Sequence, residues 1–396
     1  MDLFKKCKLN PMAAESRAAG IYPYFHVLET RQDVEVVMEG ARRIMLGSNN
    51  YLGLTASAEV ERAAKDAIDR FGTGCSGSRF LNGTLSLHVE LERELADFLG
   101  KEDAMTFSTG FQSNLGIISA LVSRTDYILC DRENHASIYD ACRLSGGKML
   151  RYRHGDMADL ERQLKKVPES AGSLIVTDGV FSMSGDICDL PAIVELAKKY
   201  GARTMVDDAH GLGVLGEGGR GTAEHFGLTD EVDVLMGTFS KSLASLGGYM
   251  CASAEITDYV RHCSRPFIFS ASIPPACAAA ARAALRELRG HPELPQRLME
   301  LADYMRGGLE RRGVRIRPSK TPIIPIYTYD AIRTLRVSRE LYDRGVFVNC
   351  VLPPATPPGE CLLRTSLMAT HTEALLDEAM DIIAAVLEED KWTPGE

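Results

Sequence analysis

The sequence has no apolar run that approaches the ~20 residues needed to cross a bilayer as a helix. Its first eight residues contain no apolar stretch of the kind that directs secretion. The 45 lysines and arginines are outnumbered by 54 aspartates and glutamates, which gives a net charge of -9, and no basic tail or stripe occurs. We therefore expect a cytoplasmic protein of ordinary globular composition that has no nucleic-acid partner.

Metal-binding and dinucleotide-binding patterns are also missing. No two of the ten cysteines lie three positions apart, and the nine histidines form no H-E-x-x-H pair or Cys/His cluster. The glycine-rich run Gly216–Gly221 lacks the glycine spacing and the preceding strand of a dinucleotide loop. The sequence thus predicts no metal site and no Rossmann site, and we interpret the cysteines as small buried side chains in a reducing compartment.

Short apolar runs alternate with amphipathic stretches through the middle of the chain. The apolar runs predict strands covered on both faces, at Ala104–Phe107, Tyr127–Cys130, Leu174–Thr177, Thr204–Val206 and Val234–Met236. The amphipathic stretches predict helices at Leu85–Leu99, Gly110–Leu121, Met157–Val167 and Pro191–Tyr200. This alternation predicts an α/β fold with a large, doubly wound, mostly parallel sheet.

After about residue 270 the pattern changes to longer helices and shorter strands. The predicted elements there are helices Pro275–Arg289, Pro295–Arg312 and Thr372–Glu389, and strands Ile323–Tyr327, Val346–Asn349 and Leu362–Ser366. We expect a large domain over residues 47–272, a smaller α+β domain over residues 273–396, and an N-terminal segment, residues 1–46, that joins the small domain.

Ligands of open α/β sheets bind beyond the carboxyl ends of the strands, where an acid and a lysine follow two predicted strands. Asp207 could keep a ring nitrogen protonated, or it could cap the next helix. His210, three residues on, could bind a phenolic oxygen or be an ordinary loop histidine. Lys241, in Gly237-Thr-Phe-Ser-Lys-Ser, has hydroxyl neighbours suited to a phosphate. An imine to an aldehyde cofactor is the common use of such a lysine, and a solvated loop lysine is the alternative.

Two further motifs follow the first two predicted strands. Ser108-Thr-Gly-Phe-Gln112 places a glycine at a helix N-terminus, where backbone amides bind phosphate, although an ordinary turn has the same pattern. Glu133-Asn-His-Ala-Ser137 places His135 where it could stack on a cofactor ring or start a helix without contacting any ligand.

These four motifs, in this order, resemble those of the α-oxoamine synthases, which are fold-type I enzymes that use pyridoxal phosphate to condense an amino acid with an acyl-CoA and release CO2. The resemblance runs from about Leu46 to His371. Gly77–Thr84, Arg265–Pro275, and Pro353–Gly359 with the following Arg364 resemble most the bacterial serine palmitoyltransferases of this family. The run Val206-Asp-Asp-Ala-His-Gly also fits its 8-amino-7-oxononanoate synthases, since many palmitoyl-type members carry Glu in place of the second Asp.

The resemblance implies a role for each matching residue. Lys241 would carry the cofactor as a Schiff base and move the Cα proton, Asp207 would pair with the pyridine nitrogen, and His135 would stack on the ring and contact the substrate carboxylate. The other implied cofactor contacts are Gly110, Phe111, Thr238 and Ser240 at the phosphate, Ser182 and His210 at the phenolic oxygen, and Ser270 and Ser272 at the phosphate of the neighbouring subunit. Arg364 would receive the amino-acid carboxylate, and Asn50 would come from the partner chain.

The implied reaction is the condensation of L-serine with palmitoyl-CoA to 3-ketodihydrosphingosine, CoA and CO2, the first step of sphingolipid synthesis, in a homodimer with shared active sites. The alternatives are the family's 8-amino-7-oxononanoate synthase and 2-amino-3-ketobutyrate CoA ligase activities, or an aminotransferase on the same fold. Membrane contact is at most peripheral: the aromatic arm Ile21–Phe25 would pack on the partner subunit or touch lipid.

Overall fold

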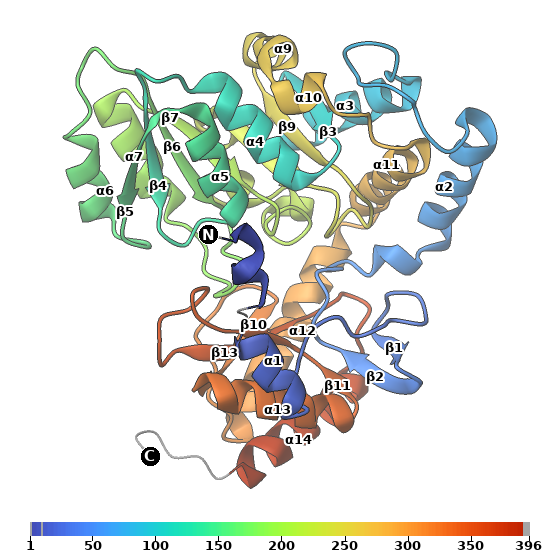
Figure 1. The fold of residues 1–396 in the computed structure, drawn as a ribbon. Coiled ribbons are helices and arrows are strands. Elements are labelled where there is room, and N and C mark those ends of the chain that lie inside the picture. Colours follow the sequence, from blue (N-terminus) through green and yellow to red (C-terminus); the bar gives the residue numbers. More distant parts are fainter. Residues whose placement is uncertain (1, 9–10, 391–396) are drawn as a thin grey trace. The chain divides into compact units, whose positions relative to one another are not determined.

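The computed structural model describes residues 2–8 and 11–390, and the chain divides into two units (Figure 1). The large unit is Asn49–Met299, and the small unit combines Met1–Ser48 with Glu300–Glu396. The boundary after Met299 comes later than the expected boundary after residue 272. The reason is that α11 (Pro275–Gly290) packs on α2 (Ala58–Phe71) and α3 (Ser86–Leu99) and so belongs to the large unit.

A seven-stranded sheet forms the centre of the large unit, in the order β3-β9-β8-β7-β6-β4-β5. Its strands are β3 (Asp103–Phe107), β4 (Tyr127–Asp131), β5 (Lys148–Tyr152), β6 (Ser173–Asp178), β7 (Arg203–Asp207), β8 (Val234–Thr238) and β9 (Gly248–Ala252). The neighbouring pairs are parallel except for those of β9, which runs antiparallel to both β3 and β8. The predicted mostly parallel sheet is confirmed. The sequence did not predict β5 and β9.

Helices cover both faces of this sheet because successive strand residues point to opposite sides. In β4, Ile128 and Cys130 enter one apolar core and Leu129 enters the other. The first core is closed by α4 (Gly110–Leu121), α5 (Ala136–Ser145), α9 (Ala254–Cys263) and α10 (Arg265–Ile268). The second is closed by α3, α6 (Met157–Leu164), α7 (Leu190–Tyr200) and α11. The helices of the first core include α4 and α5, which begin at the carboxyl ends of β3 and β4.

The small unit holds two three-stranded sheets. One has the order β1-β2-β11 and the other β10-β13-β12. Their strands are β1 (Glu35–Met38), β2 (Ala41–Met45), β10 (Ile323–Tyr329), β11 (Val346–Phe347), β12 (Asn349–Val351) and β13 (Cys361–Ser366). The predicted strand Val346–Asn349 is therefore divided between two sheets. The helices of this unit are α1 (Pro11–Ala18), α13 (Ala331–Asp343) and α14 (Glu373–Glu389), and α12 (Glu293–Arg311) contains the boundary between the units.

Within residues 2–8 and 11–390, the remaining short helices are η1 (Leu3–Lys8), η2 (Leu54–Ala56), η3 (Glu217–Gly219), α8 (Thr222–His225) and η4 (Thr229–Glu231). Among the described residues, none of the helices combines the length and the apolar character that a membrane span requires.

Candidate active site

A cavity of about 260 Å³ lies in the large unit, where β6, β7 and β8 end. It collects the following predicted cofactor residues: Gly110, Phe111, His135, Ser182, Asp207, His210, Thr238, Ser240 and Lys241. These residues lie at or just after the carboxyl ends of five strands of one sheet, β3, β4, β6, β7 and β8. They meet because these five strands run in the same direction, with the antiparallel β9 between β3 and β8. Ser270, Ser272, Asn50 and Arg364 are not part of the lining.

Lys241 lies in the connection of a β-hairpin, because β8 and β9 pair directly up to Thr238 and Gly248. Within the connection, the Phe239 N–H donates to the Gly247 carbonyl (3.0 Å) and the Ala244 N–H donates to the Lys241 carbonyl (3.0 Å). Ala244 has a left-handed φ of 50°, a conformation that costs a non-glycine residue about 1–2 kcal/mol. The turn after Lys241 is thus a tight, locally strained structure that fixes the backbone of this lysine.

One end of the cavity is built to hold an anion. Thr109 caps α4 by accepting the Gln112 N–H (3.1 Å), and the first amides of this helix therefore face the cavity beside Gly110. A Cβ at Gly110 would lie 2.8 Å from both Cβ and Oγ1 of Thr238, so only glycine permits this approach of α4 to β8. The Ser240 hydroxyl lies 2.9 Å from Thr238 Oγ1. Helix amides and two hydroxyls thus lie together in an arrangement whose chemistry suits a phosphate.

The carboxylate of Asp207 lies deeper in the cavity and is 5% exposed. Its Oδ1 accepts the Ala209 N–H (3.0 Å), and its Oδ2 accepts a hydrogen bond from the Asn114 side-chain amide (2.7 Å). On another wall, the buried hydroxyl of Tyr51 lies 2.7 Å from Nδ1 of His210, which fixes the plane of that imidazole. Asp207 and His210 are therefore held by side chains that the sequence did not single out.

His135 begins α5 as its N-cap and lines the cavity. Its backbone N–H donates to Oδ2 of Asp178 (3.1 Å). Burial lowers the pKa of the His135 imidazole, and the nearby Lys241 charge acts in the same direction, against the opposing effect of Asp207. Burial, reinforced by the charge of Asp207, raises the pKa of the Asp178 carboxyl well above its usual range. The site therefore favours the neutral form of the His135 imidazole and the protonated form of the Asp178 carboxyl.

The segment that carries Ser270 and Ser272 is hydrogen-bonded to other parts of the large unit at Ser270, Ala271 and Ser272. The side-chain amide of Gln112 donates to Ser270 Oγ (3.2 Å), the Ser108 hydroxyl donates to the Ala271 carbonyl, and the Ser272 N–H donates to the Gly77 carbonyl (3.0 Å). The ring Nε2 of His88 lies 3.0 Å from the Ile273 carbonyl. Both serines therefore have defined positions within their own chain.

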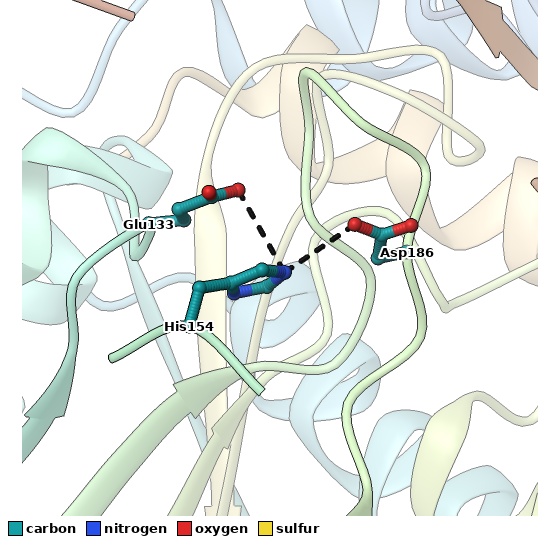
Figure 2. A group of neighbouring side chains, drawn as sticks. All are labelled: Glu133, His154 and Asp186. Carbon is teal, nitrogen blue, oxygen red and sulfur yellow. Dashed lines mark hydrogen bonds and ion pairs between the residues drawn. The ribbon is translucent and has the colours of Figure 1, made fainter. Parts of the chain in front are cut away.

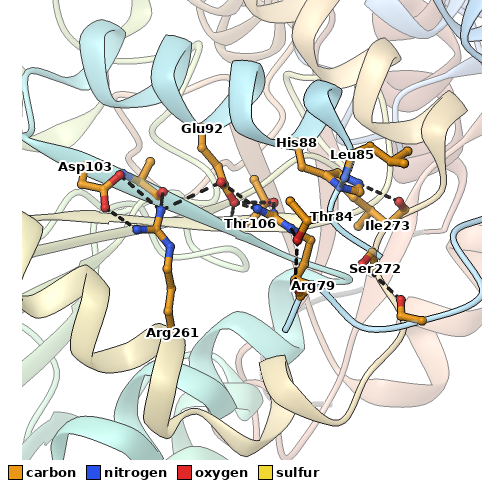
Figure 3. Close-up of polar contacts among 12 residues, drawn as sticks. Arg79, Thr84, Leu85, His88, Glu92, Asp103, Thr106, Arg261, Ser272 and Ile273 are labelled. Carbon is orange, nitrogen blue, oxygen red and sulfur yellow. Dashed lines mark hydrogen bonds and ion pairs between the residues drawn. The ribbon is translucent and has the colours of Figure 1, made fainter. Parts of the chain in front are cut away.

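A buried ion pair anchors the turn against which Ser272 packs (Figure 3). Arg79 makes a bidentate contact with Glu92 (2.6 and 2.9 Å), and the two side chains are only 9% and 6% exposed. Thr106 completes the pair, because its hydroxyl and its N–H both contact Glu92 Oε1. Arg261 extends the network to Asp103 (2.6 Å).

Two of the remaining predicted residues, Asn50 and Arg364, lie outside the cavity lining. Asn50 is buried in the large unit and bonds to Thr55, with Nδ2 donating to its hydroxyl (2.6 Å). Arg364 is a buried residue of β13 in the small unit, and one of its nitrogens lies 3.3 Å from Ser366 Oγ. Ser182 lies at the rim of the cavity, in the 179–189 connection between β6 and α7.

A second cluster of charged side chains lies beside the connections that carry His135 and Ser182. The His154 imidazole contacts Asp131 (3.0 Å), Asp186 (3.3 Å) and Glu133 (3.7 Å), and Figure 2 shows it between the last two. Glu133, His154 and Asp186 have ligand atoms within 4.8 Å of one another, the spacing of a metal site. Burial lowers the pKa of His154, but hydrogen bonds to Asp131 and Asp186 outweigh it and raise this pKa to about 10. The ring is therefore a cation that neutralises the carboxylates.

A wider hollow of about 840 Å³ lies at the opposite ends of the strands, against the first residues of β4, β6, β7 and β8. None of the predicted site residues lines it. In open α/β sheets the amino ends of the strands are not the ligand-binding ends, so the smaller cavity is the candidate active site.

The sequence did not single out four side chains that shape this site: Tyr51, Asn114, Ser137 and Asp178. Asn114 and Ser137 lie inside helices, at 1% exposure each. Ser137 ends the Glu133-Asn-His-Ala-Ser137 motif, but the sequence predicted no role for it, and no local pattern distinguishes Asn114 from other polar residues of a helix. Asp178 had a usable signal, because it ends a predicted apolar strand as Asp207 does. Tyr51 directly follows Asn50, for which the sequence did predict a role.

Comparisons with known proteins agree on one family. Residues 41–383 match the family model for class I and II aminotransferases. A serine palmitoyltransferase of Sphingobacterium spiritivorum is 50% identical over 375 residues, which covers 95% of this chain and 94% of that protein. An 8-amino-7-oxononanoate synthase of Geobacter sulfurreducens is 46% identical over 373 residues, which covers 93% of this chain and 95% of that protein. A solved structure of SPT with a PLP internal aldimine matches with a TM-score of 0.96 at 38% identity, covering 98% of this chain and 99% of that one.

Proposed function

The chain belongs to the class I and II aminotransferase family, and from this we propose that it is a pyridoxal-phosphate enzyme that condenses L-serine with a long-chain acyl-CoA, palmitoyl-CoA in the first instance. The products are 3-ketodihydrosphingosine, CoA and CO2. The single observation that carries the proposal is the meeting of Lys241, Asp207 and His135 around one cavity that also has a phosphate-binding end.

The residues present fit pyridoxal phosphate. The close approach of Gly110 to Thr238 leaves the first amides of α4 and the Ser240 hydroxyl available to the phosphate. Asp207 supplies a buried carboxylate for the pyridine nitrogen, and the cavity that connects the two ends also holds Lys241. Gly110, Phe111, Thr238 and Ser240 would hold the phosphate, and Ser182 and His210 the phenolic oxygen.

When bound, pyridoxal phosphate accepts the electron pair left on Cα of the amino acid, first on proton loss and later on loss of CO2. Asp207 keeps the pyridine nitrogen protonated, because a carboxylate beside it favours the charged form. The Lys241 amine, once released from the cofactor, takes the Cα proton and later returns one.

The new C–C bond forms as Cα attacks the thioester carbonyl, and the C–S bond then breaks so that CoA leaves as a thiolate, which takes up a proton. His135, neutral and at the edge of the cavity, donates a hydrogen bond to the substrate carboxylate or to the oxygen that becomes negative in this step. Arg364, with its bidentate guanidinium, is the proposed partner of the amino-acid carboxylate.

The site is proposed to be shared in a cytoplasmic homodimer, with Ser270, Ser272 and Asn50 contributed to the neighbouring subunit. Equilibrium sedimentation tests the dimer. Mixed dimers of two inactive variants, Lys241→Ala and Ser272→Ala, test the sharing: if Ser272 acts across the interface, one site of each mixed dimer is intact and activity returns. If mixing restores no activity, Ser272 acts within its own chain.

The assignment of Lys241 is tested by reduction with borohydride. We expect covalently trapped cofactor in the wild type and in Lys65→Ala, which removes an exposed lysine of α2 whose partner is Glu61. We expect none in Lys241→Ala. Trapped cofactor in that variant would remove Lys241 from the mechanism.

The amino acid and the acyl chain are tested by absorbance titration with L-serine, glycine and L-alanine, followed by acyl-CoAs of graded length. The second candidate is 8-amino-7-oxononanoate synthesis, supported by the 46% identical relative of that name. The carbon skeleton of that product requires L-alanine and a seven-carbon dicarboxylic acyl donor. Turnover of those substrates in preference to L-serine and palmitoyl-CoA would establish the second candidate.

A further inference from the structure

A chain of buried hydrogen bonds runs from Asp207 to His135 inside the large unit. The Nδ2 of Asn114 lies 2.7 Å from Asp207 Oδ2 and 2.9 Å from Ser137 Oγ. The Ser137 hydroxyl in turn lies 2.7 Å from His135 Nδ1. Asn114 and Ser137 are each 1% exposed, so water does not compete for these bonds. One amide therefore connects the acid proposed for the pyridine nitrogen with the histidine proposed to contact the substrate.

The direction of each bond follows from the acid. An ionised Asp207 can only accept hydrogen bonds, so the Asn114 amide must turn its NH2 group toward Oδ2. The second hydrogen of that group then points at Ser137 Oγ, which accepts it. Asn114 Oδ1 is left buried without a hydrogen-bond partner among the described residues, which is the cost of this orientation.

The donor and acceptor roles along this chain also decide which nitrogen of the His135 imidazole carries the proton. Because Ser137 Oγ accepts from Asn114, its single hydrogen is left to donate to His135 Nδ1. The Ser137 backbone N–H also points at this nitrogen (3.3 Å). With two donors aimed at it, Nδ1 must offer its lone pair, so the proton of the neutral ring sits on Nε2. Nε2–H is then the polar hydrogen that His135 offers to the cavity it lines.

We propose that Asn114 and Ser137 are positioning residues: through one hydrogen-bonded chain they hold the Asp207 carboxylate and fix His135 as the Nε2–H tautomer, a hydrogen-bond donor to anionic substrate oxygens. The opposite tautomer would face those oxygens with a lone pair and repel them. The inference rests on the proposed function for the identity of the substrate, but the hydrogen-bond chain lies within the protein itself.

The first test is the tautomer of His135 in the holoenzyme, read from long-range 1H–15N correlation spectra of protein labelled at its nine histidines. The His135 signals are assigned by their loss in His135→Gln. We expect the wild type to show a protonated Nε2 and an unprotonated Nδ1 at pH 7.5. A protonated Nδ1, alone or together with Nε2, would overturn the proposal, and the tautomer itself is read from the wild-type protein.

The second test compares Ser137→Ala and Asn114→Ala with Ser119→Ala, a control on α4 whose hydroxyl donates to the Leu115 carbonyl of its own helix. In Ser137→Ala only the backbone N–H still points at Nδ1, so we expect signals of the Nδ1–H tautomer to appear beside those of the Nε2–H tautomer. We also expect a serine KM raised about fivefold to tenfold, the effect of one hydrogen bond, with unchanged affinity for pyridoxal phosphate. In Asn114→Ala we expect the affinity for the cofactor to fall by a similar factor, because Asp207 loses a donor.

The Ser119→Ala control should match the wild type in the His135 tautomer, the serine KM and the affinity for pyridoxal phosphate. A Ser137→Ala protein with the wild-type tautomer and the wild-type serine KM would overturn the role of Ser137, and wild-type cofactor affinity in Asn114→Ala would overturn that of Asn114. If the wild type turns over alanine in place of serine, KM is measured for alanine. The proposed function then fails, while the assignment of the tautomer is still decided by the spectra.

Discussion

Gly110→Ala tests whether the packing of α4 on β8 sets the phosphate site. The added Cβ would lie 2.8 Å from Cβ and Oγ1 of Thr238, whereas carbon atoms in contact prefer about 3.5–4.0 Å. Thr238 cannot give way easily, because its Cβ is attached to a strand that pairs with β9 at Gly248. The N-terminus of α4 must therefore move by roughly 1 Å, and its first amides are the groups proposed to bind the phosphate.

The cost of such overpacking is typically about 1–3 kcal/mol. If the displacement falls on the phosphate-binding amides, the dissociation constant of pyridoxal phosphate rises by about fivefold to 150-fold. The assay is titration of the apoenzyme with pyridoxal phosphate, followed by the absorbance of the bound cofactor. Calorimetry of the same apoenzyme separates a local loss of affinity from a general loss of stability.

Gly290→Ala is the matched control. Gly290 is the last residue of α11, and a Cβ there meets no atom within 4 Å. We expect unchanged cofactor affinity and a stability equal to the wild type or higher by up to about 1 kcal/mol, since alanine favours the helix. If Gly110→Ala binds pyridoxal phosphate as tightly as the control does, the contact between Gly110 and Thr238 does not determine the phosphate site.

Three further predictions concern buried charges. His154→Gln removes the cation between Asp131 and Asp186. Because the pKa of His154 is raised from 6.5 to about 10, the protonated ring stabilises the folded protein fully below about pH 6.5, and this stabilisation is lost as the pH rises through 10. Urea denaturation should show a loss of about 2–4 kcal/mol at pH 7 that nearly vanishes at about pH 10.5, and an equal loss at both would refute it. The raised pKa of Asp178 makes ionisation of its carboxyl destabilising to the folded apoenzyme. The stability of Asp178→Asn relative to the wild type should therefore rise with pH above the usual carboxyl range, by up to about 1.4 kcal/mol per pH unit. A stability difference that does not change between pH 5 and 8 would contradict this. Arg79→Met should cost about 3–5 kcal/mol by leaving Glu92 buried without its partner, and Arg79→Met/Glu92→Leu should recover most of that loss; equal losses in the single and double variants would show that the pair is not coupled.

The sequence predicted the parts of the fold that depend on local pattern. Uninterrupted apolar runs identified β6, β7 and β8, and the polar residues that end them or follow them, Asp207 and Lys241, line one cavity. The sequence did not predict the edge strand β5, because this strand is mostly exposed or half-buried and has no clear apolar run. β9 was not predicted because it begins with a glycine, although all of it is buried.

The sequence could not predict the features that depend on which helices and strands pack against one another. α11 belongs to the large unit because it packs on α2 and α3. The change in sequence pattern near residue 270, to longer helices and shorter strands, does not reveal that contact. Asn114 and Ser137 became visible only when α4 and α5 were placed side by side, since their bonds join residues 23 and 93 positions apart. Motifs at strand ends are local in sequence, whereas the residues that orient them come from distant segments.

The hairpin that carries Lys241 has a consequence for the rate at which its amine reacts. Both ends of the connection are paired to each other at Thr238 and Gly248, so the loop has far less freedom than one that leads into a separate helix. In the proposed mechanism the released amine would stay within reach of Cα, restricted to the rotations of its own side chain. Such tethering is equivalent to a very high local concentration of base, and in well-oriented intramolecular reactions that effective molarity reaches about 10⁵ M or more. By closing this hairpin, the antiparallel strand β9 would give the proposed base a fixed place beside its substrate, without recruitment from solution.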